Sequence, residues 1–192
     1  ARSLVDRDRF TPILVGSVIL AALLLLRRRA LLRRLERCHR YLGDPLHDRF
    51  RYTFLALIIT ILLALPGPLL GSMVGWKFYF SLYDSGLAKA VGPALRWIAV
   101  YWFAIAFFYH LCRPKGLAHR HLGWIEGTLA PLRRATLILM FCFLPLNLVN
   151  ACLVTLDAEG AQAELIKVGW MLEILVFALF FYFVLRQKGG VM

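Results

Sequence analysis

The stretch FRYTFLALIITILLALPGPLLGSMVGW, Phe50 to Trp76, decides the fold class of this chain. It carries no charged residue between Arg51 and Lys77. At a helical rise of ~1.5 Å per residue, its roughly 25 apolar residues exceed the ~30 Å thickness of a bilayer's hydrocarbon core. The sequence therefore predicts a membrane-spanning helix over residues 52–76.

The whole chain shares this character, because 60% of its 192 residues are hydrophobic and its mean hydropathy is positive. A soluble domain of this size has too small a core to bury so much apolar surface. Further apolar runs predict more spans. The five expected spans cover residues 10–26, 52–76, 91–111, 135–156 and 168–185. We therefore expect an all-α, polytopic transmembrane helix array that forms a single membrane domain over residues 1–192.

Two prolines, Pro66 and Pro68, interrupt the deciding stretch with Gly67 between them. Proline lacks a backbone N–H, so each one leaves a helix carbonyl without its usual donor. In lipid such carbonyls must be satisfied by protein, so we expect this site to face other helices and to kink the second span. Pro145 predicts a similar kink in the fourth span, and the small residues Gly67, Gly71, Ser72 and Gly75 allow a close helix contact. Proline is also common in membrane helices without a special role, and this alternative stays open.

The net charge of +12 is distributed unevenly between the two sides of the expected spans. Residues 27–51, residues 112–134 and the C-terminal tail carry nine, five and two basic residues, whereas the opposite side carries six. Cytoplasmic loops are enriched in Lys and Arg, which predicts an extracytoplasmic N-terminus and a cytoplasmic C-terminus. Residues 27–51 and 112–134 are then basic cytoplasmic loops.

The basic residues invite two interpretations, contact with anionic lipid and binding of nucleic acid. Their position beside apolar spans favours lipid, so we expect no nucleic-acid partner. Leucines at helical spacing among the arginines of residues 27–42 also predict an amphipathic helix on the membrane surface, with a solvated connector as the alternative. The expected headgroup contacts are Arg27, Arg28, Arg29, Arg33 and Arg34.

Two charged residues, Arg96 and Glu173, lie inside expected spans. Each is about five residues, or roughly 7 to 8 Å, from the outer end of its span. An unpaired charge at that depth is costly, so an intramembrane Arg96–Glu173 ion pair is predicted. The alternatives are an Arg96 side chain that extends toward the interface and a protonated Glu173. Asn147 and Asn150 are expected to form interhelical hydrogen bonds.

Four potential metal ligands, His110, Cys112, His119 and His121, straddle a helix end and a proline-containing loop. They lack the closed ligand spacing of zinc sites, and only His110 is near a span where haem would be held. We expect neither a metal nor another cofactor. The chain also shows no nucleophile with a base, no paired carboxylates within the membrane and no phosphate-binding glycine loop, so we expect no enzyme activity. A secondary transporter would show two repeated halves, which this sequence lacks.

Three strings identify a resemblance: RRRALLRRLERC (27–38), DRFRYTFLALIITILLALPGPLLGSMVGW (48–76) and LCRPKGLAHRHLGW (111–124). Together they resemble the inner-membrane domain of large, multi-domain members of the MscS mechanosensitive channel superfamily, of the potassium-dependent KefA (MscK) type. The likeness is strongest over residues 24–134. Gly67 departs from the family pattern, in which an aromatic residue stands at this position.

The resemblance implies a bacterial inner-membrane channel, assembled as a homo-oligomeric ring of about seven copies, that opens under bilayer tension and releases solutes during osmotic shock. It also implies that this chain is the peripheral, lipid-contacting helix array and that the pore helix belongs to another segment. The chain starts at Ala1 without a signal-peptide pattern, and we expect it to be part of a longer protein. A non-conducting membrane scaffold or accessory subunit is the alternative.

Overall fold

The structure of the protein is a computed structural model that describes residues 2–40, 49–79, 86–114, 116–120, 123–157 and 160–186. Within these ranges, the side chains of residues 2–11, 37–40, 49–50, 87–88, 120 and 126 are not described. Every regular element in the described part is a helix, which confirms the predicted all-α class. The helices are α1 (Arg2–Arg40), α2 (Arg49–Ala64), α3 (Pro66–Tyr79), α4 (Gly86–Leu111), α5 (Leu117–Arg120), α6 (Glu126–Leu156) and α7 (Ala163–Leu185).

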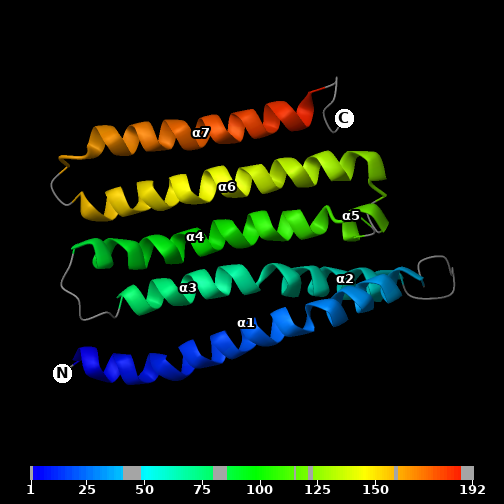
Figure 1. The fold of residues 1–192 in the computed structure, drawn as a ribbon, viewed down its shortest axis with the longest axis horizontal. Coiled ribbons are helices and arrows are strands. Elements are labelled where there is room, and N and C mark those ends of the chain that lie inside the picture. The colour runs from blue at the N-terminus through cyan, green and yellow to red at the C-terminus, as the bar shows by residue number, and fades with distance from the viewer. Residues whose placement is uncertain are drawn as a thin grey trace.

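The long helices lie side by side in chain order and alternate in direction (Figure 1). α1 begins at one end of the array and α7 finishes at the other, while α2 and α3 together make one passage. Sequence neighbours pack on each other, with α3 on α4, α4 on α6 and α6 on α7. This arrangement follows from short connections between long helices, because a short loop returns the chain beside the helix it has just left.

Within the described residues, three helices are long and apolar enough to cross a membrane by themselves, at Lys89–Leu111, Gly127–Leu156 and Ala163–Leu185. The bent pair Arg51–Ala64 and Pro66–Tyr79 makes a fourth candidate. In α1 the apolar run with described side chains, residues 12–26, is shorter than the ~20 residues that a span needs. The count of five spans and their orientation therefore stay predictions.

α1 continues without interruption through Arg27, Arg28 and Arg29 to its end at Arg40. The amphipathic segment is therefore not the separate surface helix that the leucine spacing predicted. Its apolar side chains Leu31, Leu32 and Leu35 instead pack on α2, in a cluster with Ala56, Ile59, Leu63 and Leu117. The preference for helix persists because the arginines and leucines are both good helix formers.

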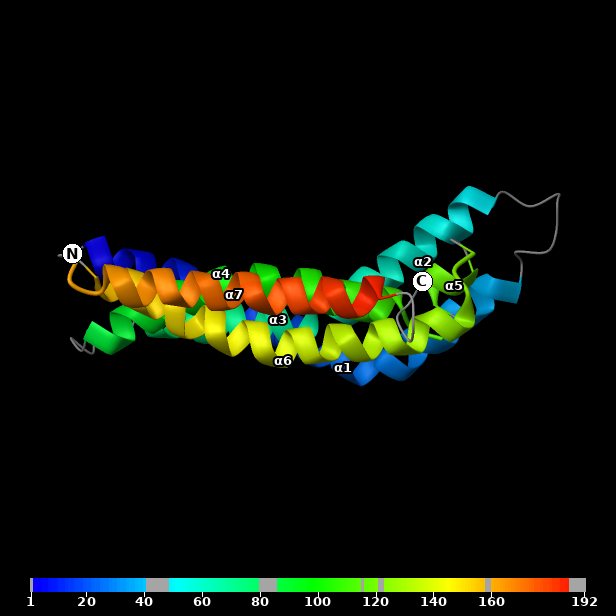
Figure 2. The same cartoon turned by 90° about the horizontal axis from the view of Figure 1, so that it is seen from above.

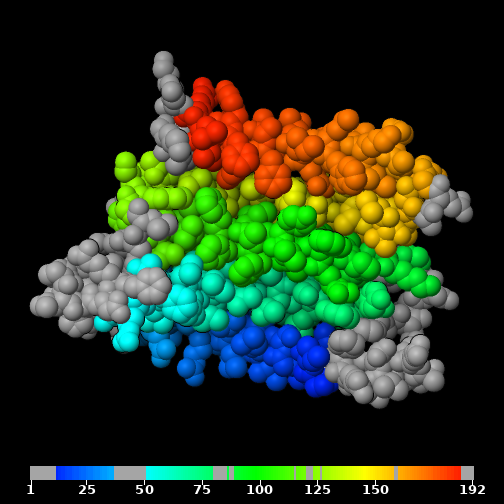
Figure 3. Space-filling model, turned by 180° about the vertical axis from the view of Figure 1, so that it is seen from behind, coloured from blue at the N-terminus to red at the C-terminus, as the bar shows by residue number. Residues whose placement is uncertain are grey.

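The array buries little of its apolar surface. Large hydrophobic side chains remain exposed along α1, α4, α6 and α7, and none of the residues of α7 is buried. Figure 3 shows one broad face on which the helices appear as parallel ridges from α1 to α7. Two small clusters stabilise the contacts of α6, one with α4 and α7 around Phe143 and one around Leu129 beside α5. Exposure of this extent requires an apolar environment outside the chain.

Candidate functional site

The double proline lies at a break in the array, where α2 ends at Ala64 and α3 begins at Pro66. The two helices are inclined by 42°. The helical hydrogen bonds bridge the break at two points: Leu65 N–H donates to Ile61 O at 3.1 Å, and Leu69 N–H donates to Leu65 O at 3.0 Å. Because neither proline has an N–H, the carbonyls of Leu62 and Ala64 lose their usual helical donors, and the chain bends here.

Beyond the break, α3 presents a row of glycines to α4. A Cβ added to Gly67 would lie 2.8 Å from Trp102 Cζ2, and one added to Gly71 would lie 3.1 Å from Trp102 Cζ3. One turn further, Gly75 and Gly92 face each other so closely that a Cβ on Gly75 would lie 2.8 Å from the Gly92 carbonyl oxygen. Only glycine permits this approach of two helix backbones.

Pro66 and Pro68 are both buried, in agreement with the expectation that the break faces protein. Sequence reasoning identified the glycines of α3 but missed their partners, Trp102 and Gly92. A glycine in the first turns of α4 was the available signal for the second contact. α6 continues through Pro145 as one helix from Glu126 to Leu156, so the chain has no break there, and the kink expected at Pro145 stays a prediction.

Arg96, in α4, stacks its guanidinium on aromatic rings of α3. Its Cζ lies 3.9 Å from the centroid of the Trp76 ring and 5.7 Å from that of Tyr79. Such contacts between a cation and an aromatic face are worth about 0.5–2 kcal/mol, with the larger values where water is excluded. The arginine therefore reinforces the same α3–α4 contact as the glycines.

Glu173, in α7, is held by two amides of α6. Asn147 Nδ2 donates to Glu173 Oε2 and Asn150 Nδ2 donates to Glu173 Oε1, each at 3.1 Å. The predicted Arg96–Glu173 ion pair is thus not formed, because Arg96 lies against the α3 rings while Glu173 is bound across α6. The hydrogen bonds expected of the two asparagines are present, and their acceptor is the very carboxylate that had been assigned to Arg96.

The five arginines proposed as headgroup contacts lie in the second half of α1, and their side chains are exposed. Arg28 differs from its neighbours, since it lines a groove of about 190 Å³ that also contains Pro66, Trp102 and Tyr109. Two further arginines lie near it: Arg133 binds Tyr109, which lines the groove, and Arg113 is influenced electrostatically by both Arg28 and Arg133. Sequence reasoning placed Arg28 in one basic loop, 27–51, and Arg113 and Arg133 in another, 112–134.

The potential metal ligands that the structure describes, His110, Cys112 and His119, do not form a metal-binding group. Among the described residues, no three His, Cys, Asp or Glu side chains form a group that could hold an ion. Cys112 is buried, and burial raises the pKa of its thiol to about 11 against the opposing influence of Arg133. His119 pairs its Nδ1 with the Trp124 carbonyl oxygen at 3.0 Å, and His121 lies outside the described residues.

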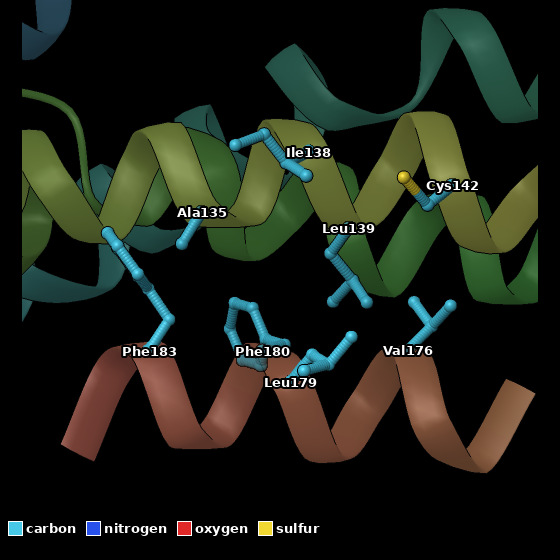
Figure 4. A pocket seen from close by; sticks show the side chains of 8 residues that line it. All are labelled: Ala135, Ile138, Leu139, Cys142, Val176, Leu179, Phe180 and Phe183. Atoms are coloured by element: carbon cyan, nitrogen blue, oxygen red, sulfur yellow. The ribbon is translucent and has the colours of Figure 1, made fainter. Parts of the chain in front are cut away.

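A second groove, of about 240 Å³, runs between α6 and α7. Figure 4 shows its lining side chains, which are all apolar or, in the case of Cys142, weakly polar. They include Ile138, Val176 and Phe180. Such a groove can accommodate hydrocarbon but offers no charged group to a ligand.

Comparison with known proteins agrees with these features. Over 121 residues the chain is 29% identical to the miniconductance mechanosensitive channel MscM of Escherichia coli (strain K12). The matched segment covers 63% of this chain and 11% of that relative, so the chain spans only a small part of the relative's length. No solved structure matches.

A family of membrane domains matches nearly the whole chain, from residue 11 to residue 192. The break at Pro66, the apolar helices and the exposed outer surface all fall within this match. The chain is therefore a multi-pass membrane domain, and it belongs to the family described as mechanosensitive ion channel inner membrane domain 1.

Proposed function

We propose that this chain is the lipid-contacting helix array of a bacterial inner-membrane channel, where it senses bilayer tension and contributes to solute release during osmotic shock. The observation that carries the proposal is the 42° bend between α2 and α3 in a domain of this channel family. A stretched bilayer shifts an equilibrium only if two conformations of the protein interact with it differently. The bend within one passage of the array is one such conformation, and straightening the passage would give the second.

The size of the available movement follows from helix geometry. α2 has 16 residues and is about 24 Å long at ~1.5 Å per residue. With a 42° inclination, its far end is displaced by roughly 24 Å × sin 42°, or about 16 Å, from the extended axis of α3. Figure 2 shows α2 leaving the layer of the other long helices. Straightening the pair would therefore change the area that the array occupies in the bilayer.

The two helices of the bent pair, α2 and α3, have different contacts with the rest of the array. α3 is fastened to α4 through Gly67, Gly71 and Gly75 and through the stacking of Arg96 on Trp76. α2 packs both on α4 and on the second half of α1, which bears the exposed arginines. Anchoring these arginines to anionic headgroups, at about 1 kcal/mol per charge, would couple α2 to the cytoplasmic leaflet.

The topology within this proposal has five crossings, an extracytoplasmic N-terminus and a cytoplasmic C-terminus. The alternating direction of the long helices and the arginine-rich end of α1 support it. Assembly as a homo-oligomeric ring of about seven copies, and dependence on potassium, complete the proposal and rest on the family resemblance alone.

The test is the double substitution Pro66→Ala and Pro68→Ala in the full-length channel, with tension applied to a membrane patch. Proline in a helix interior costs about 3 kcal/mol relative to alanine, so the substitutions favour a straight α2–α3 pair. We assign the bent conformation to the resting channel and expect a lower tension threshold. Pro131→Ala, a change in another helix, is the control and should leave the threshold unchanged. An unchanged threshold in the double variant would refute the proposal.

A further inference from the structure

The groove lined by Arg28 is amphiphilic. Its apolar part is formed by Leu24 and Leu25 of α1, by Pro66 and Gly67 at the break, and by Trp102 of α4. Its polar end is formed by Arg28, Tyr109 and His110. The groove between α6 and α7, by contrast, has a similar volume and no charged lining residue.

Three arginines from distant parts of the sequence lie near the polar end: Arg28 lines it, Arg133 binds the lining residue Tyr109, and Arg113 interacts electrostatically with both. Arg28 lies in α1, Arg113 follows α4 and Arg133 lies in α6. Burial lowers the pKa of Arg113, and the nearby Arg133 and Arg28 lower it further, while Glu36 and Tyr109 oppose the shift. Among the described side chains, the cluster therefore brings three cations together with Glu36, and such a surplus of like charge favours an anion.

The hydrogen bonds at this end leave donors unused. Arg133 Nη2 donates to the Tyr109 hydroxyl oxygen at 2.6 Å, and the guanidinium also lies over the Tyr109 ring at 4.4 Å. Arg133 Nε is buried and has no hydrogen-bond partner among the described residues. Because the Tyr109 oxygen accepts from Arg133, the hydroxyl hydrogen is also available to a further acceptor.

From these contacts we infer that the groove binds one anionic phospholipid. The phosphate lies among Arg28, Arg113 and Arg133, and an acyl chain lies along the apolar part against Trp102. Arginine guanidinium is well suited to phosphate because it offers several N–H donors in a planar fork. An apolar groove leading away from that phosphate site fits a lipid and has no use for a free inorganic anion.

This site connects lipid occupancy with the bend. The acyl chain would contact Pro66 and Gly67, where the α2–α3 break occurs, while the headgroup links α1, α4 and α6. The inference rests on the part of the proposed function that embeds the chain in a bilayer. It does not depend on tension gating, so a binding measurement and a gating measurement can fail separately.

The experiment uses the full-length protein with the photo-cross-linking residue p-benzoylphenylalanine at Leu25, in vesicles of equal amounts of phosphatidylglycerol and phosphatidylcholine. Mass spectrometry gives the ratio of the two lipids cross-linked. The same residue at Ile138, in the apolar groove of Figure 4, provides the matched control. We expect enrichment of phosphatidylglycerol at Leu25 and the bulk ratio at Ile138. Equal ratios at the two positions would overturn the inference.

Substitutions then locate the charges responsible. At about 1 kcal/mol per charge, the double variant Arg113→Gln, Arg133→Gln should lower the phosphatidylglycerol enrichment roughly 30-fold, or to the bulk ratio. The control is the double variant Arg134→Gln, Arg186→Gln, which removes as much charge outside the site and should keep the enrichment. Arg28→Gln changes an exposed side chain, should fold normally, and should lower the enrichment about fivefold. Enrichment that survives the loss of these arginines would contradict the site. Enrichment that millimolar inorganic phosphate abolishes would show a free-anion site and refute lipid binding.

Discussion

The contact of Gly75 with α4 predicts the effect of adding one carbon atom. In Gly75→Ala the new Cβ would lie 2.8 Å from the Gly92 carbonyl oxygen and 3.0 Å from Leu95 Cβ. An ordinary contact begins at 3.4 Å, so the Gly92 oxygen must withdraw by about 0.6 Å, the difference between 3.4 and 2.8 Å. Because this oxygen belongs to a helix backbone, the movement requires α3 and α4 to separate.

The net cost combines two opposing effects. Overpacking a close contact costs about 1–3 kcal/mol, while replacing glycine by alanine in a helix gains about 1 kcal/mol. Gly16→Ala provides the control, because nothing lies within 4 Å of its added Cβ and it receives the same gain in helix stability. The free energy of unfolding of Gly75→Ala should therefore fall below that of Gly16→Ala by about 1–3 kcal/mol.

The assay is thermal unfolding of the two variants in the same detergent, followed by circular dichroism. For a chain of this size 1 kcal/mol corresponds to about 2–4 °C, so a difference of 2 kcal/mol should lower the Tm of Gly75→Ala by about 4–8 °C relative to Gly16→Ala. Equal Tm values in the two variants would refute the close approach of α3 and α4 at this position.

Three other substitutions or measurements test separate parts of the structure. Because Arg96 and Glu173 have different partners, the losses of unfolding free energy in Arg96→Leu and Glu173→Leu should add in the double variant within about 0.5 kcal/mol. A larger coupling energy in this double-mutant cycle would show that the two residues form the ion pair after all. The amide oxygen of Gln in Glu173→Gln can still accept a hydrogen bond from Asn147 or Asn150. The unfolding free energy of this variant, measured by denaturant titration, should therefore exceed that of Glu173→Leu by about 1 kcal/mol. Burial raises the pKa of the Cys112 thiol to about 11, so its alkylation should accelerate as pH rises from 8 to 11, and rapid alkylation at pH 8 would contradict this burial. Because the ordinary pKa of the thiol is 9.0, its contribution to stability should be present below pH 9 and lost as pH rises toward 11.

Much of the architecture can be predicted from local sequence. Apolar runs of about 20 residues require helices in lipid, because no other isolated segment satisfies its own backbone there. The prolines at 66 and 68 likewise indicate a break, since the missing N–H groups are a covalent property. The unequal arginine content of the two sides also needs no structure to be seen.

Only the tertiary structure decided which residues contact the two charges within the spans, Arg96 and Glu173. Arg96 and Glu173 lie at similar depths, but depth along a span does not show which side of the helix a charge occupies or which helix it faces. The ring of Trp76 and the amides of Asn147 and Asn150 are equally compatible with the sequence spacing. The sequence therefore allowed the ion pair, but the packing of the helices gives each charge a different partner.

By itself the sequence determined a chain of apolar helices with a proline break and one arginine-rich side, because these properties depend on residues within a single segment. Only the tertiary structure decided that Gly67 meets Trp102, that Gly75 meets Gly92, and that Arg28 and Arg133 approach the same groove. The last two arginines are 105 positions apart, from 28 to 133. Helical periodicity describes the face of one helix, whereas a contact between helices depends on how all of them rotate and pack together.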